Sequence, residues 1–111
     1  MKIVNRPWGH FNQFVKNKKC TVKILEIKPK QELSLQYHRK RKEIWYFLTD
    51  GYVQIGLEKK KVKKGELIVI KKRVAHRVFS KDKKVVWLEI SVGKFRERDE
   101  VRIEDKYGRA R

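Results

Sequence analysis

The sequence has little of what stabilises secreted proteins or anchors proteins in membranes. It holds one cysteine, Cys20, among 111 residues, so no intrachain disulfide can form and a reducing compartment is expected. No apolar run approaches the length of a membrane span, and the N-terminal residues MKIVNRPWG lack the apolar core of a signal peptide. These absences exclude a disulfide-stapled fold and predict a cytoplasmic protein without membrane contact.

Acidic residues are also scarce. The sequence has 13 Asp and Glu against 31 Lys and Arg, a formal net charge of +18. Such an excess attracts polyanionic or phosphorylated partners. Nucleic acid is the obvious rival partner, but the basic residues are spread through the chain rather than gathered in one stripe or tail. We therefore do not expect nucleic acid to be the ligand.

Short segments that alternate apolar and polar residues, separated by turn residues, run through the chain without a long helix or an internal repeat. This pattern is typical of an all-β barrel, and the length suits a single domain over residues 1–111. Trp8 and Phe11 are expected to cap one end of the core, and a lysine-rich hairpin turn is expected at 59–64. The expected strands, after a short N-terminal one that ends at Pro7, cover residues 11–14, 21–28, 33–38, 43–48, 52–57, 67–70, 76–79 and 85–92.

One stretch, LSLQYHRKRKEIWYFLTDG, brings metal-ligating residue types together. Gln36 and His38 are two apart and so share one face of a strand. The RKRK turn that follows is short enough for the next strand, beginning at Glu43, to fold back beside the first. A second histidine, His76, lies eleven residues after Gly65. Each residue alone is commonly structural, but together Gln36, His38, Glu43 and His76 form a plausible ligand set for a divalent metal.

This spacing resembles the two motifs of the cupins, G-x5-H-x-H-x4-E-x6-G and G-x5-P-x-G-x2-H-x3-N. Gln36 stands at the first histidine position, while His38, Glu43 and His76 match the motifs. The sequence departs from them chiefly at turn positions: Lys30 replaces the first Gly, Gly51 comes one residue late, Lys71 and Arg73 replace the Pro and Gly of the second motif, and Ser80 replaces its Asn. The resemblance implies an all-β cupin barrel, a double-stranded β-helix.

Within the cupins, the chain resembles the type II mannose-6-phosphate isomerases, a module often found at the C-terminal end of bifunctional mannose-1-phosphate guanylyltransferases. LSLQYH, Arg41-x-Glu43-x-Trp45, the RPWG of residues 6–9 and the EDKYGR of residues 104–109 carry this likeness. It implies metal-dependent interconversion of mannose 6-phosphate and fructose 6-phosphate, feeding mannose activation and polysaccharide biosynthesis. The implied cofactor is a divalent metal, zinc first, with manganese, nickel or cobalt as alternatives.

The isomerase reading gives roles to further polar residues. Lys23 matches a family lysine that precedes the metal motif; it would bind phosphate or transfer a proton if it faces inward, although a solvent-facing lysine is commoner. Glu89 interrupts the apolar run VVWLEISV and is either a pocket residue or a salt-bridged strand residue. Arg41 and Lys23 are the expected catalytic residues, and the general base stays open among tyrosine, lysine and a carboxylate. The residues expected to bind substrate are Arg6, Arg41, Glu89 and Arg109.

Other functions share the same ligand set. The chain could be a non-catalytic module that binds a sugar phosphate or sugar nucleotide, possibly as partner of a guanylyltransferase, because fold does not settle function. A metal-dependent dioxygenase or epimerase is a third possibility. No G-x-G-x-x-G or P-loop occurs, so nucleotidyl transfer by this chain alone is not expected. The strands at 33–37 and 44–48 are apolar on both faces, which predicts a homodimer.

Overall fold

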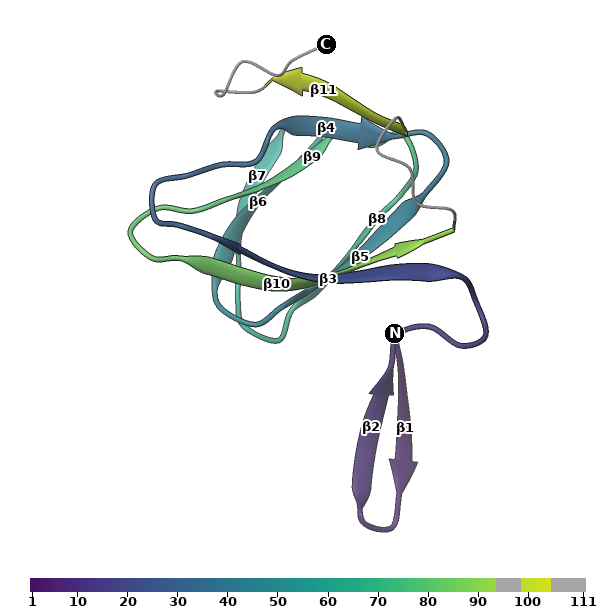
Figure 1. Ribbon diagram of the computed structural model, residues 1–111. Coiled ribbons are helices and arrows are strands. Elements are labelled where there is room, and N and C mark those ends of the chain that lie inside the picture. Colours follow the sequence, from purple (N-terminus) through teal and green to yellow (C-terminus); the bar gives the residue numbers. More distant parts are fainter. Residues whose placement is uncertain (94–98, 105–111) are drawn as a thin grey trace.

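A computed structural model describes residues 1–93 and 99–104 of the chain as an all-β protein (Figure 1). The strands alternate apolar and polar residues and follow one another through short turns, as the sequence predicts. Their bounds are β1 Lys2–Arg6, β2 Gly9–Gln13, β3 Cys20–Ile27, β4 Leu35–His38, β5 Lys42–Phe47, β6 Gly51–Ile55, β7 Glu58–Val62, β8 Leu67–Ile70, β9 His76–Phe79, β10 Val85–Val92 and β11 Glu100–Glu104.

Two sheets face each other and form a barrel. One has the strand order β3-β10-β5-β8 and the other β11-β4-β9-β6-β7, with antiparallel pairing throughout. Side chains of alternate residues point inward and meet between the sheets. Trp45, Phe47 and Trp87 from one sheet pack with Val53 and Val78 from the other, all 0–1% exposed. This apolar core fills one end of the barrel and leaves the other end for polar residues.

The strand that carries Gln36 and His38 does not pair with the strand that carries Glu43, contrary to the prediction. β4 lies between β11 and β9, whereas β5 lies between β10 and β8 in the opposite sheet. The turn between them therefore crosses from one sheet to the other, so the inner faces of β4 and β5 look at each other across the barrel. The convergence of their side chains was predicted correctly, but its cause is sheet-on-sheet packing rather than cross-strand pairing.

The predicted hairpin turn at residues 59–64 is also wrong. Residues Lys59 to Val62 belong to β7, and the chain reverses at Gly56 and Leu57, where Ile55 pairs with Glu58. Gly56 has a φ of 60°, a left-handed conformation that glycine adopts without steric cost and that two-residue hairpin turns favour. Lys59, Lys60 and Lys61 lie on this strand at the edge of the sheet, where charged side chains discourage pairing with other chains.

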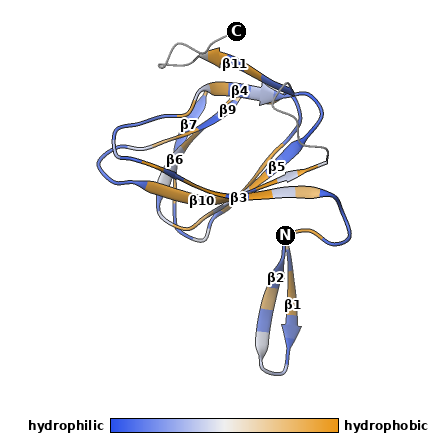
Figure 2. Cartoon of the chain, viewed as in Figure 1, coloured by the Kyte–Doolittle hydropathy of each residue, from blue (hydrophilic) through white to orange (hydrophobic). Residues whose placement is uncertain are grey.

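The first two strands form a hairpin that projects away from the barrel (Figure 1). Trp8 is 73% exposed and Phe11 is 38% exposed, so they do not cap the core as expected. The physical reason is that β1 pairs with β2 and with neither barrel sheet, so their side chains have no barrel surface beneath them. Figure 2 shows hydrophobic stretches both in this hairpin and along β10.

Two residues that replace motif glycines keep the backbone conformation that glycine would adopt. Lys30 has a φ of 58° and Arg73 a φ of 66°. The left-handed region is costly for residues with a Cβ, by about 1–2 kcal/mol. The turns of the cupin motifs are therefore preserved although their glycines are not, and the Arg73 turn donates its backbone N–H to the His38 carbonyl at 2.6 Å.

Replacing Arg73 by glycine should stabilise the protein. The side chain is exposed and the backbone is left-handed, so Arg73→Gly should raise the free energy of unfolding by about 1 kcal/mol in urea denaturation. Arg73→Ala is the matched control, because alanine removes the same side chain but keeps the strained Cβ. Equal effects of the two substitutions would contradict the assignment of strain to this position.

Candidate metal centre

Three predicted ligands meet at the polar end of the barrel. His38 comes from β4, Glu43 from β5 and His76 from β9, and one ligand atom of each lies within 4.8 Å of the others. All three side chains are buried, with 1–2% of each residue exposed. Two imidazoles and a carboxylate at this spacing are the donor set of many zinc and other transition-metal sites. The geometry thus brings together residues separated by up to 38 positions in the chain.

The hydrogen bond of His76 fixes which ring nitrogen faces the cluster. Nδ1 lies 2.8 Å from the Val74 carbonyl oxygen, which can only accept, so Nδ1 carries the proton. Nε2 therefore presents its lone pair to Glu43, whose Oε1 is 3.5 Å away, and it has no hydrogen-bond partner among the described residues. A buried lone pair beside a carboxylate requires a proton or a cation between them. A carbonyl behind a ligating imidazole is the usual outer contact of metal-bound histidine.

Glu43 is held in place by two neighbours. Trp45 Nε1 donates to its Oε1 at 3.2 Å, and Ser91 Oγ donates to its Oε2 at 3.4 Å. Burial by itself raises the pKa of Glu43, but the contact with His76 and the nearby His38 and Arg41 outweigh it and lower that pKa to about 2. The carboxylate is thus ionised at neutral pH, as a cation ligand must be.

Arg41 lies against the same cluster. Its Nη2 donates to His38 Nε2 at 2.8 Å and lies 3.4 Å from Glu43 Oε2, and the residue is only 3% exposed. Because a guanidinium can only donate, His38 Nε2 accepts in this contact, and the other ring nitrogen, Nδ1, lies 3.8 Å from Glu43 Oε2. A positive group is therefore already attracted to the position where the two histidines and Glu43 converge.

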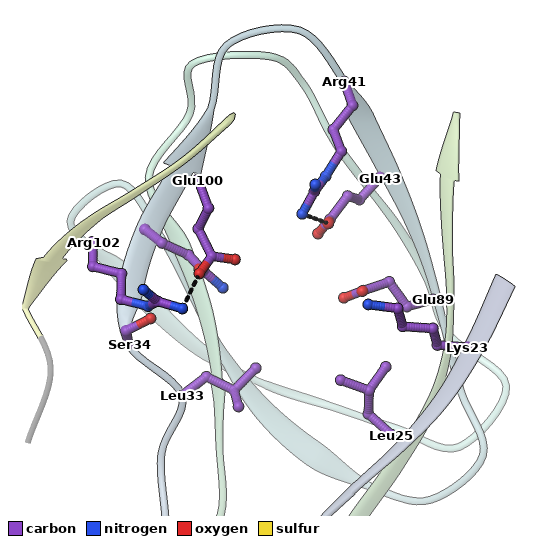
Figure 3. A pocket seen from close by; sticks show the side chains of 10 residues that line it. Lys23, Leu25, Leu33, Ser34, Arg41, Glu43, Glu89, Glu100 and Arg102 are labelled. Carbon is purple, nitrogen blue, oxygen red and sulfur yellow. Dashed lines mark ion pairs between the residues drawn. The ribbon is translucent and has the colours of Figure 1, made fainter. Parts of the chain in front are cut away.

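A cavity of about 200 Å³ opens beside the cluster (Figure 3). Glu89 faces it from β10 and Lys23 faces it from β3, as neighbours in register across these two strands. Figure 3 shows the Lys23 side chain beside Glu89 at the cavity, although the residue is also exposed to solvent. The lining consists of Lys23, Leu25, Leu33, Ser34, Gln36, Arg41, Glu43, Glu89, Glu100 and Arg102.

Glu89 titrates unlike an ordinary glutamate. It is 8% exposed, and burial together with repulsion by Glu43 raises its pKa from 4.5 to about 7, in spite of the opposing charges of Lys23 and Arg41. A carboxyl group with a pKa near 7 can both accept and release protons at neutral pH, which suits a general acid or base.

The sequence prediction missed two charged residues of the cavity wall, Glu100 and Arg102, and it included Arg6, which does not line the cavity. Asp99 accepts from the backbone N–H groups of Arg39 and Lys40 at 3.0–3.1 Å, and β11 then places Glu100 and Arg102 in the cavity wall. Their only sequence signal was an alternation of charged and apolar residues over 100–104. Arg6 lies in the projecting β1–β2 hairpin, where it stacks on Phe11. Arg109 lies outside the described residues.

The residues present fit a divalent metal. The unsatisfied His76, His38 and the ionised Glu43 each offer a ligand atom, these atoms lie within 4.8 Å of one another, and all three residues are buried. Gln36, the fourth predicted ligand, also lines the cavity, where its amide lies against Glu100.

Comparison with known proteins identifies the family of the chain. Residues 1–105 match the family described as mannose-6-phosphate isomerase C-terminal. The chain belongs to this family. Among solved structures, a cupin protein from Bacteroides fragilis superposes with a TM-score of 0.60 at 16% identity, covering 80% of this chain and 92% of the other. The all-β cupin fold expected from the motifs is thereby confirmed.

Curated relatives of the family are longer proteins. Mannose-1-phosphate guanylyltransferase ManC of Salmonella typhimurium is 33% identical over 109 residues, and xanthan biosynthesis protein XanB of Xanthomonas campestris is 33% identical over 110. Each alignment covers 96% of this chain but 23% of the relative. The chain thus spans less than a quarter of the length of these relatives, whose own names refer to mannose 1-phosphate and to xanthan biosynthesis. Within residues 1–93 and 99–104, no helix has the length and apolar character needed to cross a membrane.

The raised pKa of Glu89 should make stability fall with pH. Since its folded pKa of about 7 exceeds the ordinary 4.5, the folded chain keeps a proton that the unfolded chain has lost, and this stabilisation disappears as pH rises through 7. With chelator present, wild type should lose about 3 kcal/mol relative to Glu89→Gln between pH 4.5 and 8, measured by urea denaturation. Parallel pH profiles for the two proteins would contradict the assignment.

Proposed function

We propose that the chain interconverts mannose 6-phosphate and fructose 6-phosphate with a divalent metal at His38, Glu43 and His76. The observation that carries the proposal is the buried cluster of these three residues at the wall of a small cavity that also holds Lys23 and Glu89. The membership in the mannose-6-phosphate isomerase C-terminal family supports the substrate. When bound, the cation would polarise the sugar carbonyl and stabilise negative charge that develops on its oxygen.

The charges of the cavity suit a small phosphorylated sugar. Three cations, Lys23, Arg41 and Arg102, line it together with three carboxylates. Arg102 is paired with Glu100 at 2.8 Å, Arg41 is close to Glu43, and Lys23 lies beside Glu89 on the neighbouring strand. The cavity volume of about 200 Å³ is smaller than the roughly 300–1,000 Å³ of pockets for drug-sized ligands, so the cavity suits a small ligand. We infer that Lys23 and Arg41 attract the phosphate.

Aldose–ketose isomerisation needs a group that takes the proton from C2 and returns it to C1. The sequence left tyrosine, lysine and a carboxylate open, but the described residues that line the cavity include no tyrosine. Glu89 is the better candidate of the remaining two, because its pKa of about 7 suits proton exchange in both directions. Lys23, its cross-strand neighbour, would then favour the ionised form that removes the proton.

Hydrogen exchange at C2 tests the proposal directly. Mannose 6-phosphate incubated in heavy water with metal-loaded protein should gain deuterium and yield fructose 6-phosphate, both followed by NMR. Glu89→Gln is isosteric but cannot accept the proton, so it should lower kcat by about 10²–10⁴ while substrate binding persists. Chelator should abolish turnover of the wild type.

The competing function is a module that binds a sugar phosphate or sugar nucleotide without turnover, serving a guanylyltransferase partner. The longer relatives favour this alternative. They are named as a guanylyltransferase and a xanthan biosynthesis protein, and this chain corresponds to 23% of their length. Binding of mannose 6-phosphate with neither deuterium exchange nor fructose 6-phosphate would establish it and contradict the isomerase.

We also propose a homodimer, on a surface that differs from the expected one. Leu35 and Ile44 are already 9% and 6% exposed within the single chain, and Phe14 packs on the outer side of Tyr46 with ring centroids 5.3 Å apart. Apart from scattered residues such as Leu48 and Val69, exposed apolar side chains lie on the outer face of β3, at Val22 and Ile24, and in the β1–β2 hairpin. A second copy would cover both, since apolar residues in such numbers are unusual on a monomer surface.

Light scattering tests the dimer. Wild-type protein at micromolar concentration should have the mass of two chains, and Ile24→Asp should shift it to one, because Ile24 is 67% exposed and a buried aspartate would be unpaired. Leu57→Asp is the matched control at a residue that is 99% exposed on the β6–β7 turn, and it should leave the mass unchanged. A monomeric wild type would contradict the proposal.

A further inference from the structure

A fourth side chain, the carboxylate of Glu100, approaches the candidate metal centre from outside the cupin motifs. Glu100 is the first residue of β11 and lies directly opposite His38 of β4. Directly opposite residues of antiparallel strands present their side chains on the same face, so both point into the barrel. Glu100 Oε1 is 3.5 Å from His38 Nε2, the ring nitrogen that also accepts from Arg41, and the side chain is 17% exposed.

The carboxylate of Glu100 is held in this position by two neighbours. With its amide nitrogen turned toward Glu100, Gln36 donates to both carboxylate oxygens at 2.5 and 2.9 Å. Arg102, two residues further along β11, lies 2.8 Å from Oε2. The strand itself is anchored where Asp99 caps the backbone N–H groups that follow β4. Figure 3 shows Glu100 in the cavity wall across from Arg41 and Glu43.

The chemistry of these contacts assigns different roles to Gln36 and Glu100. An amide nitrogen has no lone pair to offer a cation, and in this arrangement it is the nitrogen of Gln36 that is engaged. A carboxylate oxygen is a good ligand for zinc, manganese and cobalt. His38, Glu43 and His76 supply three ligands, one fewer than a tetrahedral site and two or three fewer than a site of five or six ligands.

We propose that Glu100 is a fourth ligand of the cation held by His38, Glu43 and His76, and that Gln36 is a positioning residue for Glu100. The proposal rests on the metal centre of the proposed function. It makes β11 part of the centre, because the pairing of this strand with β4 places a negatively charged ligand there. A site with five or six positions still leaves room for substrate oxygens. Without a cation, Gln36 and Arg102 hold the Glu100 carboxylate beside His38.

Cobalt binding to the full chain tests this role without reference to activity. Titration with Co²⁺, followed by calorimetry and by visible absorption, should show one site in the wild type. Glu100→Gln keeps the shape of the side chain and should weaken affinity by about ten- to a hundredfold while changing the absorption spectrum. Glu26→Gln is the matched control, because Glu26 is an exposed glutamate paired with Lys84 and its loss changes the net charge equally. It should bind cobalt like the wild type.

A double-mutant cycle tests the positioning role of Gln36. Gln36→Met removes the amide but keeps the length of the side chain, and it should weaken cobalt binding in the wild type. In the Glu100→Gln background it should have no further effect, because the group that it orients is already gone. Losses that add across the two substitutions would show that Gln36 acts on the metal independently and would overturn this part of the proposal.

Each outcome separates this inference from the proposed function. Unchanged cobalt affinity and spectrum in Glu100→Gln, alongside loss of binding in His38→Ala, would overturn the role of Glu100 and keep the metal centre. A wild type that binds no cobalt would overturn both. If circular dichroism shows that Glu100→Gln is unfolded, Glu100→Asp keeps the charge but withdraws the oxygen by one methylene; wild-type affinity and spectrum in that variant would likewise overturn the proposal.

Discussion

The approach of two imidazoles to one buried carboxylate is the constraint on which the rest of the polar end depends. His38, Glu43 and His76 come from three strands in two sheets, and none is more than 2% exposed. Without a positive group between them, the lone pair of His76 and the Glu43 carboxylate would repel one another in a medium of low polarity. The surrounding residues answer this need: Arg41 reaches in, Trp45 and Ser91 donate to Glu43, and Val74 fixes the tautomer of His76.

The barrel makes this arrangement stable because its two ends differ. Trp45, Phe47 and Trp87 form an apolar layer with the valines of the facing sheet, directly below the cluster. The inner face of β5 shows the transition within one strand, from Glu43 to Trp45 and then Phe47. Similarly, β10 changes from Trp87 to Glu89 to Ser91. The apolar half supplies the free energy that holds the polar half in place, as a functional site on a rigid scaffold requires.

Local spacing allowed most of the fold, and the convergence of three candidate ligands, to be predicted from sequence. The period of two along strands and the motif distances around His38, Glu43 and His76 are properties of short segments, and the structure keeps them even where Lys30 and Arg73 replace glycine. Long-range pairing was not readable in this way. Glu100 enters the cavity because β11 pairs with β4, 62 residues away in sequence, and β4 and β5 separate into different sheets. The prediction that Trp8 caps the core was wrong for the same reason, since nothing in the local sequence indicates whether the β1–β2 hairpin packs on the barrel.

The net charge of +18 describes the surface better than the site. The cavity itself balances three cations against three carboxylates, so long-range attraction would bring an anionic substrate near while local pairs decide how it binds. Substrate binding and chemistry would both depend on the candidate metal centre. X-ray anomalous scattering from crystals grown with cobalt tests it most directly. We expect one strong peak bonded to Nε2 of His76, to a ring nitrogen of His38 and to the carboxylate of Glu43. A structure in which cobalt is absent from this position, with Arg41 still between His38 and Glu43, would contradict it.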